Sequence, residues 1–189
     1  MIQMKFKGII FENKLREKIS ELEKEYGTNL STTQKILLCE HGPITTLLDV
    51  LYGDLHLFIL DQHLEKADEN VAELLQIEPG DEIDYREVIV HKNGRPLIYT
   101  LSYIAIERCS EEIFDDLMNE RLTTGGIIDK NVIETFITIK NISIESPSPT
   151  LKELFKTNEN MLSREYVMTH NKEIVIWTKE EYPLSYFKV

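Results

Sequence analysis

The stretch that decides the fold is Ile83-Asp84-Tyr85-Arg86-Glu87-Val88-Ile89-Val90-His91, which is followed by Lys92-Asn93-Gly94-Arg95 and by the run Pro96–Ile106. Asn-Gly between two alternating runs is a strong signal for a tight hairpin turn. The sequence therefore predicts two antiparallel strands joined at residues 92–95.

The chain before this hairpin is predicted to be largely helical. Leu15, Ile19, Leu22 and Tyr26 recur at spacings of four, three and four, which is the apolar stripe of an amphipathic helix. Further helices are expected over Thr32–Glu40, Ile44–Leu51 and Ala67–Ile77, with one strand at Leu55–Ile59.

The chain after the hairpin is predicted to add more strands than helices. We expect a helix at Ser110–Leu122, a strand at Ile133–Ile144, a short helix at Leu151–Phe155, and a second hairpin from Arg164–Thr169 and Glu173–Trp177. Helices gathered early and antiparallel strands gathered late indicate an α+β fold. Because no linker divides the chain, we expect one domain over residues 1–189, with an N-terminal helical segment (1–40) and a core (41–189).

The charge balance excludes several classes of partner. Among 189 residues there are 21 Lys and Arg against 33 Asp and Glu, a net charge of −12. Binding nucleic acid without regard to sequence needs a basic face, and so does docking on an anionic membrane. No apolar run reaches the roughly 18–20 residues of a membrane span. We expect a cytoplasmic protein that binds neither nucleic acid nor membrane.

Metal and nucleotide chemistry find no support in the motifs. The two cysteines exclude a disulfide framework, and the five histidines are dispersed without the spacing of a metal site. Dinucleotide and phosphate-binding fingerprints are absent. Gly125-Gly126 can present backbone N–H groups to an anion, although a simple helix stop is the more ordinary interpretation.

The most informative single residue is Arg86. In its strand, Arg86, Val88 and Val90 point to one side and Tyr85 and Ile89 to the other. Both sides are substantially apolar, so an arginine there is costly unless a carboxylate or an anionic ligand pairs with it. The pattern leaves two alternatives open, which are a structural pair with a glutamate of a neighbouring strand and a ligand site.

Two glutamates are weaker candidates. Glu180 lies in Lys179-Glu180-Glu181-Tyr182-Pro183 at the end of a mainly apolar strand, where it can serve in proton transfer or hydrogen bonding. By pattern alone, a solvated charge cluster is the simpler interpretation. Glu134 precedes Thr135 in another strand, and a surface position is favoured for it.

Neighbouring residues add a resemblance. Tyr85-Arg86-Glu87-Val88, then a hairpin and Leu97–Ser102, resembles the central signature of the chorismate pyruvate-lyase family. Other blocks follow in the family's order between about residues 41 and 184: His41–Leu48, Thr123-Thr124-Gly125, Ile133-Glu134-Thr135-Phe136, Ser163–Tyr166 and Glu180–Pro183. The Ile-Glu-Thr-Phe block resembles one branch of that family. Thr46 and Thr123-Thr124 depart from the usual pattern.

The resemblance implies a central antiparallel sheet with helices packed on one side. It implies conversion of chorismate to 4-hydroxybenzoate and pyruvate without metal or organic cofactor. Arg86 matches the arginine that holds the ring carboxylate, and Glu180 matches the glutamate at the hydroxyl side, with Lys179 and Glu181 as competitors for that position. Substrate-binding positions are then expected at Ile44, Thr45, Gly125, Glu134 and Arg164.

A second function of another class stays open. The same fold serves as the small-molecule sensing domain of bacterial transcription regulators, so a non-catalytic binder of an aromatic carboxylate is the alternative. Only about 40 residues precede Ile44, and no basic recognition helix is visible among them. The sequence leaves the oligomeric state undetermined.

Overall fold

A six-stranded antiparallel sheet forms the centre of the computed structural model, which describes residues 14–42, 44–110, 113–116 and 134–188. The strands are β1 (His56–Lys66), β2 (Glu82–Lys92), β3 (Arg95–Ala105), β4 (Phe136–Glu145), β5 (Met161–His170) and β6 (Glu173–Pro183), in the spatial order β1-β2-β3-β6-β5-β4. The helices are α1 (Lys14–Glu25), α2 (Thr32–Cys39), α3 (Ile44–Tyr52), α4 (Glu69–Leu75) and α7 (Pro149–Phe155), with a 3-10 turn at η1 (Ile106–Arg108). The α+β fold predicted from the sequence is confirmed.

Both predicted hairpins are present, and each has a tight turn built from two residues with positive φ angles. Asn93 and Gly94 have φ values of 50° and 77°, and Asn171 and Lys172 have φ values of 50° and 71°. Two successive positive φ angles suit the right-handed twist of the flanking strands. Each turn therefore fixes the register of its hairpin, β2 with β3 and β5 with β6.

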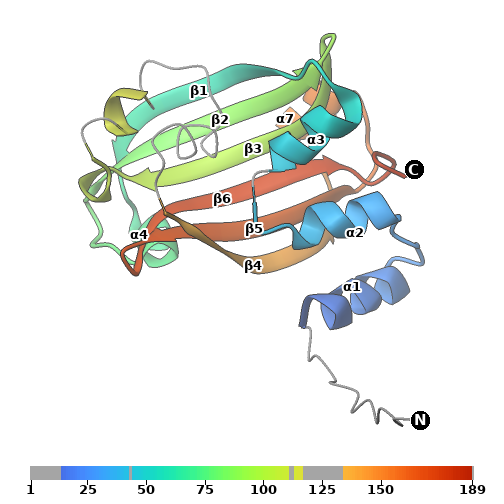
Figure 1. Ribbon diagram of the computed structural model, residues 1–189, viewed down its shortest axis with the longest axis horizontal. Helices are drawn as coiled ribbons and strands as arrows, with labels where there is room; N and C mark the ends of the chain where they lie inside the picture. Colours follow the sequence, from blue (N-terminus) through green and yellow to red (C-terminus); the bar gives the residue numbers. More distant parts are fainter. Residues whose placement is uncertain (1–13, 43, 111–112, 117–133, 189) are drawn as a thin grey trace, which may run out of the picture.

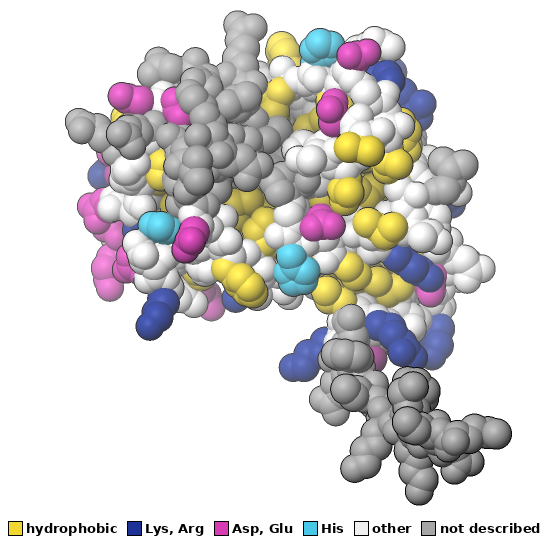
Figure 2. All heavy atoms as spheres, in the orientation of Figure 1, with side chains coloured by type: hydrophobic (Ala, Val, Ile, Leu, Met, Phe, Trp, Pro, Cys, Tyr) yellow, Lys and Arg dark blue, Asp and Glu magenta, His cyan; other side chains and the backbone are white. Residues whose placement is uncertain are grey.

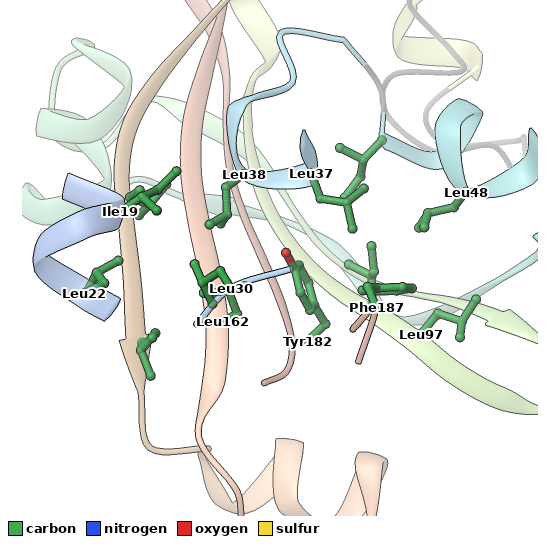
Figure 3. Packing of buried hydrophobic residues seen from close by; sticks show 14 of the residues in the cluster. Ile19, Leu22, Leu30, Leu37, Leu38, Leu48, Leu97, Leu162, Tyr182 and Phe187 are labelled. Atoms are coloured by element: carbon green, nitrogen blue, oxygen red, sulfur yellow. The ribbon is translucent and has the colours of Figure 1, made fainter. Parts of the chain in front are cut away.

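Helices α1, α2 and α3 pack on one side of the sheet, as predicted (Figure 1). We refer to this side as the α2–α3 face; it carries Val90, Ile98, Leu162 and Tyr182 at one end of the strands. Figure 3 shows Tyr182 between Leu162 and Phe187, with its hydroxyl on the side of Leu37 and Leu38. The N-terminal helix joins the same apolar cluster through Ile19 and Leu22.

The two shorter helices contact the other side of the sheet. Val71 and Leu75 of α4 pack with Trp177, and Leu151 and Phe155 of α7 pack with Tyr99. We refer to this side as the opposite face. None of the helices in the described part of the chain is long and apolar enough to cross a membrane.

Local signals explain where α2 begins and how it is held. Ser31 accepts a hydrogen bond from the backbone N–H of Gln34, and the Gln34 side chain accepts one from the backbone N–H of Ser31, a capping box. The buried Gln34 amide also donates to the carbonyls of Leu184 and Tyr186. These bonds anchor α2 to the residues that follow β6.

Two strands differ from the sequence expectation in length. Strand β1 continues to Lys66, beyond the predicted end at Ile59, because an edge strand can carry the polar run Asp61-Gln62-His63, in which Asp61 and His63 are exposed and Gln62 is half-buried. Strand β6 continues to Pro183, beyond the predicted end at Trp177. The charged residues 179–181 therefore lie inside the sheet.

Candidate functional site

A belt of buried polar side chains crosses the middle of the α2–α3 face. One apolar cluster lies at one end of the strands, around Tyr182 and Leu162, and another at the other end, around Ile104 and Met168. Between them, the described members of the belt are Asp84, Arg86, Ser102, Arg164, Tyr166, Thr178 and Glu180, and every one of them is buried. Buried polar groups in such number need a ligand or one another.

Arg86 lies on β2 with its side chain fully buried. Its neighbours in register are Gln62 on β1 and Ser102 on β3, so no glutamate stands opposite it on either adjacent strand. Burial lowers the pKa of the guanidinium, and the charge of Asp84 opposes that effect. The structural Arg–Glu pair that the pattern left open is therefore not formed with a directly facing residue.

Small hydroxyl side chains continue the row from Arg86 across the sheet. Ser102 on β3 faces Thr178 on β6, and their hydroxyl oxygens lie 3.0 Å apart. Tyr166 on β5 is the next residue in the same row. The row thus has a long cation at one end, a phenol at the other, and short side chains between them.

Arg164 and Glu180 form a buried ion pair in the neighbouring row. The Arg164 Nε donates to Glu180 Oε2 at 2.5 Å, and the side chains are 0% and 7% exposed. Tyr166 donates its hydroxyl to Glu180 Oε1 at 3.1 Å, and the guanidinium lies 4.8 Å from the centre of the Tyr166 ring. Burial opposes the charge of Arg164, but Glu180 and the adjacent phenols leave its pKa raised.

The same arginine fixes the end of α2. Arg164 Nη1 donates to the carbonyl oxygens of Leu37 and Glu40, each at 2.9 Å. These carbonyls belong to the last turn of α2, where no later N–H group of the helix is available to donate a hydrogen bond to them. Arg164 therefore connects the belt of buried polar side chains on the sheet to the segment between α2 and α3. Across that connection, Ile44 is buried at the start of α3 and Thr45 is half-buried.

Burial also governs the other groups near Arg164. It raises the pKa of the Cys39 thiol and of the Tyr182 hydroxyl, and the charge of Arg164 partly offsets both effects. Both groups therefore stay neutral near pH 7. They contribute no charge to the site.

The structure decides between the three competing residues at the end of β6. Glu180 lies on the α2–α3 face, in the strand row next to Arg86, whereas Lys179 and Glu181 point to the opposite face. Lys179 pairs there with Glu145, with Nζ and Oε1 2.7 Å apart. Glu180 is 6% exposed, so the solvated cluster favoured by pattern alone is wrong. The reason is that β6 extends through these residues.

Two other predicted positions do not join the belt. Glu134 is exposed just before β4, toward the opposite end of that strand from Ile142, which is the register partner of Arg164. Its carbonyl oxygen accepts a hydrogen bond from His170 Nδ1 at 2.9 Å. Gly125 lies outside the described residues.

Sequence reasoning missed Asp84, Ser102, Tyr166 and Thr178. Asp84 carried a usable signal, because it lies two residues before Arg86 and so shares its face. The other three are recognisable only once the register between strands is known. Chemically, the belt offers two guanidinium groups and two carboxylates in a buried setting, which suits an anionic ligand with further hydrogen-bonding groups. Within the described ranges, no group of three or more His, Cys, Asp or Glu is arranged to hold a metal ion.

Comparison with known sequences finds one family and one curated relative. Residues 38–188 match the family described as chorismate pyruvate-lyase, Rv2949c-like. A candidate lyase of Methanocaldococcus jannaschii is 31% identical over 167 residues, which cover 85% of this chain and 82% of that protein.

Comparison with solved structures finds the same fold in regulator domains. The effector domain of PhnF from Mycobacterium smegmatis aligns with a TM-score of 0.62 at 15% identity, over 75% of this chain and 88% of that one. A GntR-family transcriptional regulator from Bacillus cereus aligns with a TM-score of 0.59 at 16% identity, over 71% of this chain and 95% of that one. At such identities the likeness concerns the fold alone.

Proposed function

Because the chain belongs to the Rv2949c-like chorismate pyruvate-lyase family, we propose that it is a lyase that eliminates pyruvate from chorismate and leaves 4-hydroxybenzoate. The observation that carries the proposal is that Arg86 and Glu180 are both buried on the α2–α3 face in adjacent rows. Ser102 and Thr178 continue the row of Arg86, and Thr100 faces Glu180 in the next row. A cation and a carboxylate so arranged suit the two ends of a ring that bears a carboxylate and a hydroxyl.

The spacing supports this assignment. Arg86 and Glu180 lie two strands apart across the sheet and two residues apart along it. With neighbouring strands about 4.8 Å apart and a rise of about 3.4 Å per residue, their Cα atoms are separated by about 12 Å. That separation suits a ligand that bears a carboxylate at one end and a hydroxyl at the other, with each end hydrogen-bonded to one of the two long side chains.

In the proposed reaction the substrate supplies most of the driving force. The C–O bond between the ring and the enolpyruvyl group breaks, and its electron pair leaves with the enolpyruvate. The ring loses the proton at C4 and becomes aromatic, while the enolpyruvate takes up one proton at its methylene carbon and leaves as pyruvate. Arg86 binds the ring carboxylate through two parallel N–H···O bonds. Glu180, held by Arg164 and Tyr166, accepts a hydrogen bond from the hydroxyl of the ring. The protein thus acts mainly by orienting the substrate in a site shielded from water.

The test is incubation of the protein with chorismate and measurement of both products. We expect 4-hydroxybenzoate and pyruvate in equal amounts. Arg86→Met should lower kcat/KM about a hundredfold or more, since losing one partner of a buried charge pair costs about 2–5 kcal/mol. Arg95→Met is the matched control, because Arg95 is exposed on the same hairpin and stacks on the Tyr186 ring. Normal turnover in Arg86→Met would refute the site assignment.

A second function rests on a separate observation. The aligned solved structures include the effector domain of a regulator, and the only described carboxylate in the row of Arg164 is already engaged by that arginine. Both observations favour a non-catalytic binder of an aromatic carboxylate. Calorimetric titration with 4-hydroxybenzoate beside the turnover assay separates the two: binding without any product favours the binder, and product favours the lyase.

A further inference from the structure

A second carboxylate lies beside Arg86 and is not needed for the reaction as proposed. Asp84 is two residues before Arg86 on β2, so both side chains emerge on the α2–α3 face, and both are 0% exposed. Asp84 Oδ2 accepts a hydrogen bond from Gln62 Nε2 at 2.9 Å. Its other oxygen, Oδ1, is buried and has no hydrogen-bond partner among the described residues. A buried acceptor in that state is costly.

Asp84 has apolar, polar and charged groups near it on several elements. Leu64 on β1 and Ile104 on β3 lie opposite it in register, and Gln62 on β1 donates a hydrogen bond to it. The charges of Arg86 and His63 act on its carboxylate, and its own charge acts on the thiol of Cys109 after η1. Burial raises the pKa of Asp84 to about 6, although Gln62, Arg86 and His63 all act to lower it. Asp84 is therefore ionised at pH 7.5, and it gains a proton there when a bound ligand raises its pKa further, by about two pH units or more.

We propose that Asp84 takes up one proton when Arg86 binds a ring carboxylate, and that its Oδ1 then donates a hydrogen bond to that carboxylate. The inference rests on the proposed function in one respect, which is that the ligand carboxylate lies at Arg86. Two carboxylates that share a buried site do not both remain ionised, because their repulsion is poorly screened there. Once Asp84 is protonated, the repulsion between the two carboxylates is replaced by a hydrogen bond, in which Asp84 Oδ1 is the donor and the ligand carboxylate is the acceptor. Asp84 then selects a carboxylate over a neutral amide of the same shape.

Proton uptake is measured directly by titration calorimetry of the whole protein with 4-hydroxybenzoate in buffers of different ionisation enthalpy. At pH 7.5 we expect an uptake close to one proton for the wild type and close to zero for Asp84→Asn. The dissociation constant of the wild type should rise about tenfold per pH unit above pH about 6.5, since one proton is linked to binding. That of Asp84→Asn should stay level. With 4-hydroxybenzamide the wild type should take up no proton.

Two control variants isolate the cause. Glu82→Gln removes the same charge from an exposed position of the same strand, and His63→Gln removes the imidazole whose charge acts on Asp84. Both should keep the proton uptake. Binding without uptake in the wild type, or uptake that persists in Asp84→Asn, overturns the inference and leaves the proposed function standing. Failure of both 4-hydroxybenzoate and benzoate to bind overturns the inference together with the assignment of the carboxylate to Arg86.

Discussion

Removing the Arg164 side chain should destabilise the protein severely. Arg164→Met deletes the bond to Glu180 Oε2 and both bonds to the α2 carbonyls of Leu37 and Glu40. It leaves Glu180 buried, with the Tyr166 hydroxyl as its described donor. Methionine keeps much of the volume of the arginine stem, so the change tests the polar contacts rather than the packing.

The magnitude follows from the burial of the pair. Removing one partner of a buried ion pair costs about 3–5 kcal/mol, because the other charge stays desolvated. The two bonds to α2 place Arg164→Met at the upper end, a loss of about 4–5 kcal/mol from a total stability that is about 5–15 kcal/mol for ordinary domains. Glu180→Gln keeps an acceptor for Nε and should lose less, about 2–3 kcal/mol.

Urea denaturation of the two single variants and the double variant measures these losses. In the double-mutant cycle, the coupling energy between Arg164 and Glu180 should be about 2–4 kcal/mol. The matched control is Lys179→Met, which breaks the pair with Glu145, of similar length at 2.7 Å with side chains 20% and 38% exposed, and also a longer contact of 3.6 Å with Glu181. Solvent screens that pair, so the control should lose about 1 kcal/mol or less. An Arg164→Met variant as stable as Lys179→Met would refute the reasoning.

Three further predictions follow from single features. Burial raises the pKa of Asp84 in the folded protein to about 6. Between pH about 4 and 6 the folded protein therefore holds a proton that the unfolded chain has lost, and the free energy of unfolding falls by about 2–3 kcal/mol as pH rises through that window. In Asp84→Asn this fall should be absent from urea denaturation curves recorded from pH 4 to 7. Gly94→Ala should lower thermal stability by about 1 kcal/mol, since φ is +77° and the added Cβ meets nothing within 4 Å. An unchanged melting temperature would contradict it. Burial raises the pKa of Cys109 to about 11, so alkylation at pH 8 should be much slower in the native protein than in urea; equal rates would show that the thiol is accessible and ionised.

The exposed apolar side chains of α2 and α3 show that a sequence pattern can predict a helix without predicting which of its residues are buried. Their periodicity predicts both helices, yet Ile36, Val50 and Leu51 remain 50%, 81% and 58% exposed in the structure. Figure 2 shows hydrophobic side chains on this side of the molecule. An apolar pattern therefore identifies a helix without saying which of its apolar residues is covered, because coverage depends on the neighbours that the fold supplies.

Glu180 illustrates the same limit for a site residue. The local run Lys179-Glu180-Glu181 reads as a charged surface, and three successive charges do not predict which one is buried. The strand alternation within β6 and its pairing with β5 send Glu180 to Arg164 and its two neighbours to the other side. The family resemblance favoured Glu180 over its neighbours as a site residue, which stays a prediction, and the register explains why Glu180 is buried on the α2–α3 face.

The sequence by itself determined the elements whose signals are local. The Asn93-Gly94 turn, the amphipathic stripe of α1 and the capping residue of α2 act within a few neighbouring residues, so they are readable without knowing the fold. Arg86 was also conspicuous, because a charge in an apolar strand is costly wherever the strand lies. The tertiary structure alone decided the belt of polar side chains, the Arg164–Glu180 pair and the place of Asp84. Those depend on which strands are neighbours and in what register, and contacts between residues far apart in the chain leave no periodic trace in it.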